Sequence, residues 1–263
     1  CRGRYFDDPK AARKPDRFFA DHIPVTEQSE AVGHAVRSGY MYSAMADIAA
    51  LTGDPDYLAA INRLWENVVG KKLHLTGGIG ANPAGEAFGR NYDLPNATAY
   101  NETCAAIANA LWNYRMFLLH GDGKYIDVLE RVIYNGFLSG VGMSGDRFFY
   151  PNPLESDGQA KFNKGVNERS PWFDCSCCPV NDVRFIPSIA GYIYATRENN
   201  LFVNLYVAGS AKCDLAGRLV TIKQETRYPW DGKVVLTLTE LSGAGEFTVK
   251  LRIPGWARNH PVP

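Results

Sequence analysis

The sequence predicts a mainly α-helical protein with a C-terminal β part, and three observations support this. Residues 29–194 carry apolar side chains at helical, amphipathic spacing. Residues 201–253 instead contain strand-length apolar runs separated by Gly, Asp, Asn and Pro. A short motif also recurs in the helical part at an offset of 68 residues. With 263 residues, 46% of them hydrophobic, the chain can form one large domain or a domain and part of another.

Five helices are predicted, and most of them have a clear start or stop. The first opens at Ser29-Glu30 and is stopped by Thr52-Gly-Asp-Pro55. The third begins near Thr103 and is stopped by His120-Gly-Asp-Gly123. The predicted spans are 29–51, 55–69, 103–119, 125–138 and, with a weaker pattern, 180–193.

The recurring motif indicates a repeated helical hairpin. Leu51-Thr-Gly-Asp-Pro-Asp-Tyr57 matches Leu119-His-Gly-Asp-Gly-Lys-Tyr125. Such a repeat is typical of an α/α toroid or a helical solenoid, because each hairpin buries its apolar face only against its neighbours. Two copies are too few to close a toroid, so we expect the chain to be cut from a longer protein.

Four strands are predicted after Arg197. Their spans are 201–207, 219–226, 234–239 and 247–253. Short strands at this spacing suggest a β-sandwich, and the chain stops at Pro263 before such a sandwich would be complete. We therefore expect residues 198–263 to be the start of a sandwich domain.

Composition excludes several classes of partner. The formal net charge is zero, with 28 basic and 28 acidic residues, whereas a nucleic-acid or anionic-membrane surface needs a basic excess. No apolar run approaches the ~18 residues of a membrane span. The six cysteines are too few for a disulfide scaffold, and their clustering favours metal binding or catalysis in a reducing, cytoplasmic setting. An oxidised structural pair is the lesser alternative, and a homo-oligomer is left open.

Two cysteine-containing segments form a candidate zinc site. They are Glu102-Thr-Cys104 and Cys175-Ser-Cys-Cys-Pro179. Thiolates with a carboxylate are a zinc ligand set. On a regular helix, Glu102 and Cys104 point about 200° apart, so they converge only if they lie at the irregular start of the third helix. A helix N-terminus also favours the anionic forms of both groups.

Three alternatives to this zinc site stay open. Glu102 could cap the third helix while Cys104 fills the core. Four cysteines, Cys104, Cys175, Cys177 and Cys178, could form a structural zinc knot, although the usual paired C-x₂-C spacing is absent. Cys175 and Cys178 could also act as a C-x-x-C redox pair.

Glu86 lies in a segment, residues 76–89, that is too rich in Gly and Pro for a helix and is predicted to be a loop. No strand precedes this segment, so it is no dinucleotide-binding fingerprint. A loop glutamate is usually solvated. Phe88 and a tight backbone could instead desolvate Glu86 and raise its pKa, as a general acid requires.

Five short segments together carry a resemblance to a known family; they are Gly77-Gly-Ile-Gly80, Gly85-Glu86, Asn101-Glu-Thr-Cys104, Tyr150-Pro-Asn-Pro-Leu154 and Cys175-Ser-Cys-Cys-Pro179. With these segments, and over about residues 15–260, the chain resembles glycoside hydrolase family 127, whose members are β-L-arabinofuranosidases with an (α/α)₆ barrel followed by β-sandwich domains. The resemblance implies that residues 1–197 are the C-terminal half of the barrel. Family members are more than twice as long, so activity of this chain alone is doubtful.

The resemblance also implies the roles of individual residues. It implies a zinc ion held by Glu102, Cys104, Cys177 and Cys178, with Cys175 outside the ligand set. Cys177 is the implied nucleophile and Glu86 the implied general acid/base. Tyr150 and His34 match positions near the substrate, although a histidine on an amphipathic helix is as readily a core residue.

The implied reaction is retaining hydrolysis that releases L-arabinofuranose from β-linked arabinofuranosides. The partner would be an arabinose-containing oligosaccharide or glycoconjugate, with neither nucleic acid nor membrane involved. The alternative function is a carbohydrate-binding or scaffold protein with a structural, cysteine-rich zinc site.

Overall fold

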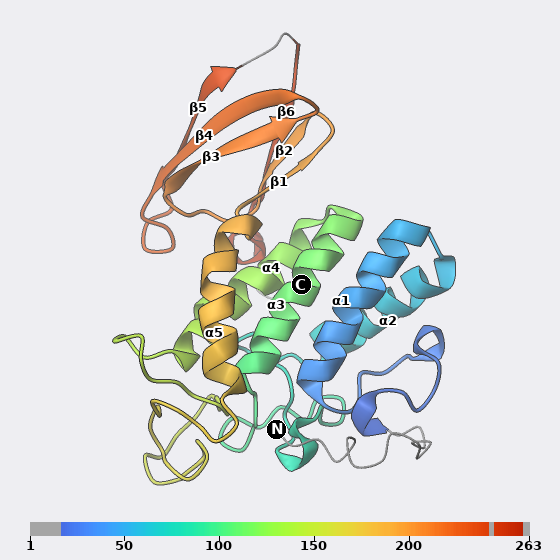
Figure 1. Cartoon of the computed structure of the whole chain (residues 1–263), viewed down its shortest axis with the longest axis vertical. Helices are drawn as coiled ribbons and strands as arrows, with labels where there is room; N and C mark the ends of the chain where they lie inside the picture. Colours follow the sequence, from blue (N-terminus) through green and yellow to red (C-terminus); the bar gives the residue numbers. More distant parts are fainter. Residues whose placement is uncertain (1–16, 242–244, 260–263) are drawn as a thin grey trace. The chain divides into compact units, whose positions relative to one another are not determined.

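The computed structural model describes residues 17–241 and 245–259 (Figure 1). The chain divides into two compact units, one up to Arg184 and the other from Phe185. The first unit is helical and the second contains two small sheets. The predicted fold class, mainly α with a C-terminal β part, is confirmed. The predicted domain limits, 1–197 and 198–263, stay a prediction.

The helices follow the predicted order. Their bounds are α1 Ala35–Thr52, α2 Pro55–Lys71, α3 Thr103–His120, α4 Gly123–Arg131 and α5 Cys177–Ser188. The fourth predicted helix does not stay regular to its end, because α4 passes into a π-helical turn at Val132–Phe137 and a 3-10 turn at Leu138–Gly140. A further 3-10 turn, Ile189–Tyr192, follows α5.

Two helix starts differ from the prediction. The first helix begins at Ala35 rather than Ser29, because the N–H of Ala31 bonds the Asn67 side chain at 2.9 Å and the residues before α1 are used in loop contacts. The fifth begins at Cys177 rather than Val180. Pro179 lies in its first turn, where a proline is tolerated because that turn has unpaired N–H groups anyway.

The repeated hairpin predicted from the motif is present. Gly53 and Gly121 end α1 and α3 in the left-handed conformation, with φ of 68° and 71°. Asp54 and Asp122 then cap α2 and α4 through side-chain hydrogen bonds to backbone N–H groups. Helix α1 packs against α2 and α3, and α3 packs against α4 (Figure 1). The two hairpins therefore share the interface between α1 and α3.

Small residues bring α1 and α3 close together. A Cβ atom at Gly39 would lie 2.8 Å from the Cβ of Ala108, so only glycine fits at this crossing. Beside it, the rings of Tyr42 and Trp112 are fully buried with centroids 4.8 Å apart. The apolar core of the first unit is thus centred on α3, which is buried along most of its length.

A buried chain of hydrogen bonds ties α2, α3 and the glycine-rich loop together. The indole N–H of Trp65 donates to Asn113 Oδ1 at 2.8 Å, and Asn113 Nδ2 donates to Asn109 Oδ1 at 2.8 Å. Asn109 Nδ2 in turn donates to the carbonyl of Gly77 at 2.9 Å. This chain of hydrogen bonds fixes the start of the loop that carries Glu86.

Replacing Asn109 with Ala should lower the free energy of unfolding by about 1–3 kcal/mol, because buried partners on Asn113 and Gly77 lose their hydrogen bonds. Urea unfolding followed by circular dichroism measures the effect. The control is Asn135→Ala, an exposed asparagine whose side chain donates to the Arg131 carbonyl one turn earlier; this change should alter stability by less than about 0.5 kcal/mol. Equal losses in the two variants would contradict a role for the buried network.

The second unit contains two three-stranded sheets. One has the order β1-β2-β6 and the other the order β3-β4-β5. The strands are β1 Tyr194–Arg197, β2 Asn200–Val203, β3 Gly209–Leu215, β4 Arg218–Thr226, β5 Val234–Leu241 and β6 Thr248–Leu251. A buried apolar cluster that includes Leu201, Cys213 and Ile222 forms its core.

Two strands were not predicted. Strand β1 lies where the helical pattern was expected to end, and β3 has apolar side chains only at Ala211, Cys213 and Leu215, which is too weak an alternation to detect. Cys213 is buried on the core side of β3, which accounts for this cysteine as a packing residue. Among the residues described, no helix is long and apolar enough to cross a membrane.

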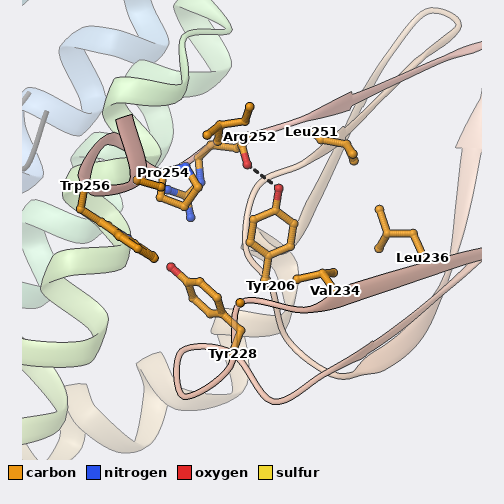
Figure 2. A pocket seen from close by; sticks show the side chains of 11 residues that line it. Tyr206, Tyr228, Val234, Leu236, Leu251, Arg252, Pro254 and Trp256 are labelled. Carbon is orange, nitrogen blue, oxygen red and sulfur yellow. Dashed lines mark hydrogen bonds between the residues drawn. The ribbon is translucent and has the colours of Figure 1, made fainter. Parts of the chain in front are cut away.

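An open pocket of about 380 Å³ lies on the second unit (Figure 2). The rings of Tyr206, Tyr228 and Trp256 lie next to one another along it, and Val234 and Leu236 line the other side. The Tyr206 hydroxyl is already used, since it donates to a backbone carbonyl. The lining is mostly apolar, and the described residues that form it bring no cluster of ionisable side chains together.

Candidate active site

Backbone hydrogen bonds hold the loop that carries Glu86. Asn82 and Ala87 exchange two backbone hydrogen bonds of 3.0 and 2.9 Å, and the N–H of Phe88 donates to the carbonyl of Gly33 at 2.9 Å. A 3-10 turn between them places Glu86 in the left-handed region, with φ of 53°. The predicted loop is confirmed, and it is anchored at both ends.

Two helix N-termini bring the zinc-ligand candidates together. Glu102 is the N-cap residue of α3, with ψ of 136°, and Cys104 is the second residue of that helix. Cys177 and Cys178 are the first two residues of α5. The four candidate ligand atoms all lie within 4.8 Å of one another. Glu102 and Cys104 converge at the irregular helix start, as their spacing predicts.

The geometry of this cluster fits a zinc ion. Zinc binds oxygen at about 2.0 Å and thiolate sulfur at about 2.3 Å, so two such ligands at a tetrahedral angle lie about 3.5 Å apart. The Sγ atoms of Cys177 and Cys178 lie 3.6 and 3.5 Å from Glu102 Oε1. Glu102 Oε2 is buried and has no hydrogen-bond partner among the residues described. The donor set and its spacing are therefore suited to a metal.

The structure bears differently on the alternatives that the sequence left open. Cys104 is buried among apolar residues, as the core alternative predicted, and it also belongs to the ligand cluster. Glu102 makes no side-chain capping hydrogen bond, although it occupies the N-cap position. Cys175 is disulfide-bonded, as the oxidised-pair alternative allowed; it is not among the grouped ligands and lines a cavity of about 500 Å³ with Tyr150. Cys178 is a fully buried, free thiol within the cluster. Neither a four-cysteine knot nor a Cys175–Cys178 redox pair matches this arrangement.

Tyr150 and His34 both contact Glu86. His34 Nε2 lies 3.1 Å from Glu86 Oε2. The Tyr150 hydroxyl donates to Glu86 Oε1 at 3.5 Å and accepts from the Cys177 thiol at 3.1 Å. His34 precedes α1 instead of lying on the helix as predicted, because its N–H is bonded to the carbonyl of Phe18.

The pKa of Glu86 differs from the sequence-based expectation. The hydrogen bond with His34 lowers this pKa most; a bond from Tyr100 adds to the effect, and together they outweigh burial to give a value of about 2. Burial does act to raise this pKa, as the sequence suggested that it could, but the hydrogen bonds outweigh it. The surroundings of Glu86 therefore favour its ionised form.

The pKa values of the clustered cysteines move apart. Hydrogen bonds with Cys104 and then Cys178 lower the pKa of Cys177, whereas the bond to Cys177 raises the pKa of Cys104. Burial raises the pKa of Cys178. Cys177 is also the partly exposed member of the three. Cys177 is therefore the cysteine of the cluster that most readily becomes a thiolate, and it is also the one that a ligand in the site could reach.

Two residues of the site were missed from the sequence. The Tyr100 hydroxyl donates to Glu86 Oε1 at 2.6 Å, and Lys164 Nζ donates to the Tyr100 hydroxyl at 2.6 Å. Tyr100 directly precedes Asn101-Glu102, so its position beside that motif was the only available signal. Nothing in the sequence around Lys164 indicated a role in chemistry.

Asp182 on α5 is also buried near the cluster. Both of its carboxylate oxygens are without a hydrogen-bond partner among the residues described. Burial, with a smaller contribution from Cys177, raises its pKa from 3.8 to about 7. Because the folded pKa is above the unfolded one, the cost of ionising Asp182 grows as the pH rises from about 4 to about 7.

Replacing Asp182 with Asn should remove this pH dependence. Between pH 4 and pH 8, wild type should lose about 2–4 kcal/mol of unfolding free energy that the variant keeps. Urea unfolding of both proteins at the two pH values gives the difference. Asp146→Asn, in an exposed turn, serves as the control. Parallel pH profiles for wild type and Asp182→Asn would contradict the assignment.

The fold and the site define a class: a helical-hairpin domain with a thiol–carboxylate cluster, followed by a β domain. Comparison with known proteins narrows this class. Residues 3–191 match the family model for the β-L-arabinofuranosidase GH127 catalytic domain, and residues 200–262 match its middle domain. The chain belongs to glycoside hydrolase family 127.

Individual relatives agree with this assignment. The chain is 38% identical over 253 residues to the non-reducing end β-L-arabinofuranosidase of Bifidobacterium longum subsp. longum, covering 93% of the chain and 38% of that protein. A solved GH127 β-arabinofuranosidase is 54% identical with a TM-score of 0.90, covering 96% of the chain and 38% of its own. A GH127 β-L-arabinofuranosidase from Geobacillus stearothermophilus T6 is 50% identical with a TM-score of 0.86. The match covers 91% of the present chain and 38% of that protein. The chain thus spans well under half the length of these relatives.

Proposed function

We propose that the protein containing this chain is a retaining β-L-arabinofuranosidase, with Cys177 as nucleophile and Glu86 as general acid/base. The observation that carries the proposal is the Tyr150 hydroxyl, which bonds both the Cys177 thiol and the Glu86 carboxylate. A double displacement needs a nucleophile and an acid/base held on one substrate. The family supports L-arabinofuranose as the sugar released, from a β-linked oligosaccharide or glycoconjugate.

The two residues would act in sequence. The sulfur of Cys177 attacks the anomeric carbon as the bond to the leaving oxygen breaks, and Glu86 gives that oxygen a proton. Water that Glu86 deprotonates then hydrolyses the thioglycosyl intermediate and frees Cys177. Two inversions at the anomeric carbon leave its configuration retained.

Glu86 has to gain a proton before the first step, since its surroundings favour the ionised form. A bound sugar displaces water from the half-buried carboxylate, and desolvation raises a carboxyl pKa. His34, whose Nε2 lies 3.1 Å from Glu86 Oε2, is the group placed to share that proton. Substrate binding and protonation are therefore expected to be coupled.

Proton NMR of the first product tests the reaction class. With an aryl β-L-arabinofuranoside as substrate, the β anomer of arabinose should appear first and then mutarotate. The α anomer as first product would exclude the covalent mechanism. No release of arabinose by the intact protein would favour the carbohydrate-binding or scaffold alternative.

We also propose that Glu102, Cys104, Cys177 and Cys178 hold one zinc ion. When bound, zinc would keep the sulfurs as thiolates near neutral pH, where a free thiol is mostly protonated. The partial (α/α)₆ barrel, the start of a β-sandwich and a cytoplasmic location belong to the same proposal.

Metal analysis of protein never exposed to a chelator should give about one zinc per chain. Cys104→Ala should lower this value and the melting temperature together, because a ligand that binds only the folded state stabilises it. Cys213→Ala removes a buried thiol outside the cluster and should leave the zinc content unchanged. Unmodified protein without zinc would refute the ligand assignment.

A further inference from the structure

Lys164 contacts the group that the proposed function uses as acid/base, and neither the mechanism nor the comparisons assign it a role. Its Nζ lies 3.6 Å from Glu86 Oε1 and 2.6 Å from the Tyr100 hydroxyl. The same ammonium lies 4.1 Å from the ring centre of Tyr150. One side chain thus touches three residues of the site.

The ammonium group also decides where the proton of Tyr100 points. A hydroxyl has one proton to donate, and an ammonium can only donate. Because Lys164 occupies the acceptor side of the Tyr100 oxygen, the Tyr100 proton is directed to Glu86 Oε1, at 2.6 Å. Oε1 is therefore held by Tyr100, with Tyr150 and Lys164 at 3.5 and 3.6 Å. Oε2 has His34 as its partner and is the oxygen left for proton transfer.

The backbone at Lys164 is strained in a way that supports a role for its side chain. Asn163 and Val166 close a tight turn whose central residues, Lys164 and Gly165, have φ of 54° and 102°. Turns with two positive φ values strongly prefer Asn-Gly, so a lysine at the first position is unfavourable. Such strain persists where the surrounding structure imposes it, and it is common at functional sites.

The surrounding structure does impose this conformation. The side chain of Asn163 is fully buried, and its Oδ1 accepts the N–H of Tyr150 at 2.8 Å. Its Nδ2 donates to the carbonyls of Phe148 and Glu168 at 3.2 and 2.8 Å. The turn is thereby fixed to the segment that carries Tyr150, and its tip reaches Glu86.

We propose that Lys164 is a positioning residue that acts through Tyr100 to fix Oε1 of Glu86, so that Oε2 faces the leaving group of the substrate. The inference rests on the proposed role of Glu86 and adds to it the residues that orient the carboxyl group. It concerns the acid-assisted step, in which a small misplacement of the proton donor is costly.

The test compares two β-L-arabinofuranosides in the metal-loaded enzyme, one with a nitrophenyl and one with an alkyl leaving group. Lys164→Met should lower kcat/KM about 10- to 100-fold on the alkyl substrate and less than about 3-fold on the nitrophenyl substrate, which needs little acid assistance. Lys164→Arg should restore most of the loss. Lys161→Met, an exposed lysine in the same loop, is the matched control and should behave as wild type.

Two further variants test whether Lys164 acts through Tyr100 and whether its effect is independent of stability. Tyr100→Phe should show the same selectivity for leaving groups, and the double variant should lose no more than the worse single variant, because both act in one chain. Lys164→Asn, which suits a positive φ, should melt at or above the wild-type temperature and still lose activity on the alkyl substrate.

Several outcomes would overturn the proposal. Equal losses on the two substrates, multiplied losses in the double variant, or a gain on the alkyl substrate would each show that Lys164 does not position Glu86. A gain is what removal of the positive charge alone would give, since the acid form would then be favoured. If Glu86→Gln shows no dependence on the leaving group, the proposed function fails first. If the activity of Glu86→Gln depends on the leaving group and that of Lys164→Met does not, only the inference about Lys164 fails.

Discussion

Replacing Cys177 with Ser should abolish hydrolysis of every β-L-arabinofuranoside, whatever its leaving group. A serine hydroxyl is harder to ionise and less nucleophilic than a thiolate, so the attack on the anomeric carbon fails before leaving-group chemistry matters. Removing a nucleophile typically costs about 10⁴-fold or more in kcat. Steady-state kinetics on nitrophenyl and alkyl substrates measure this loss.

Cys213→Ala is the matched control for this experiment. Cys213 is a buried thiol in β3, outside the zinc-ligand cluster, so its removal should leave kcat within a few-fold of wild type. Zinc content of Cys177→Ser should be measured alongside, because the residue is also a candidate ligand. A Cys177→Ser enzyme with more than a tenth of wild-type activity would show that another group is the nucleophile.

The part of this site that local sequence rules govern could be predicted. Glu102 and Cys104 are two residues apart, and helix geometry lets them converge only at a helix start; the structure places Glu102 at the N-cap of α3. The hairpin repeat was likewise visible, since Gly and Asp act locally as helix stop and cap at Gly53-Asp54.

The rest depends on contacts between distant segments, which spacing does not reveal. His34 lies just before α1 because its N–H bonds a carbonyl of a preceding turn, at Phe18. The pKa of Glu86 falls because His34 and Tyr100 form hydrogen bonds with its carboxylate. These two residues come from separate segments of the chain, one before and one after Glu86. Lys164 reaches the same carboxylate from a turn 78 residues further along the chain. Each of these would have required the tertiary structure.

Replacing Glu86 with Gln should separate the two steps of the reaction. An amide cannot protonate the leaving oxygen, so the first step should slow by about 10²–10⁴-fold for an alkyl leaving group and far less for nitrophenyl. The second step should slow for both, because no carboxylate remains to deprotonate water. Glu155→Gln, at an exposed loop glutamate, should leave both substrates unaffected.

The imbalance between the steps should be visible before the steady state. With the nitrophenyl substrate, Glu86→Gln should release about one equivalent of nitrophenol per active site in a burst, because the thioglycosyl intermediate forms faster than it is hydrolysed. Stopped-flow absorbance follows the burst, and mass spectrometry of the quenched enzyme should find the sugar on Cys177. An equal loss on both substrates with no burst would mean that Glu86 is not the acid/base. The carboxylate would then act only to hold His34 and Tyr100 in place, and the proton donor would have to be sought among the other groups that face Cys177.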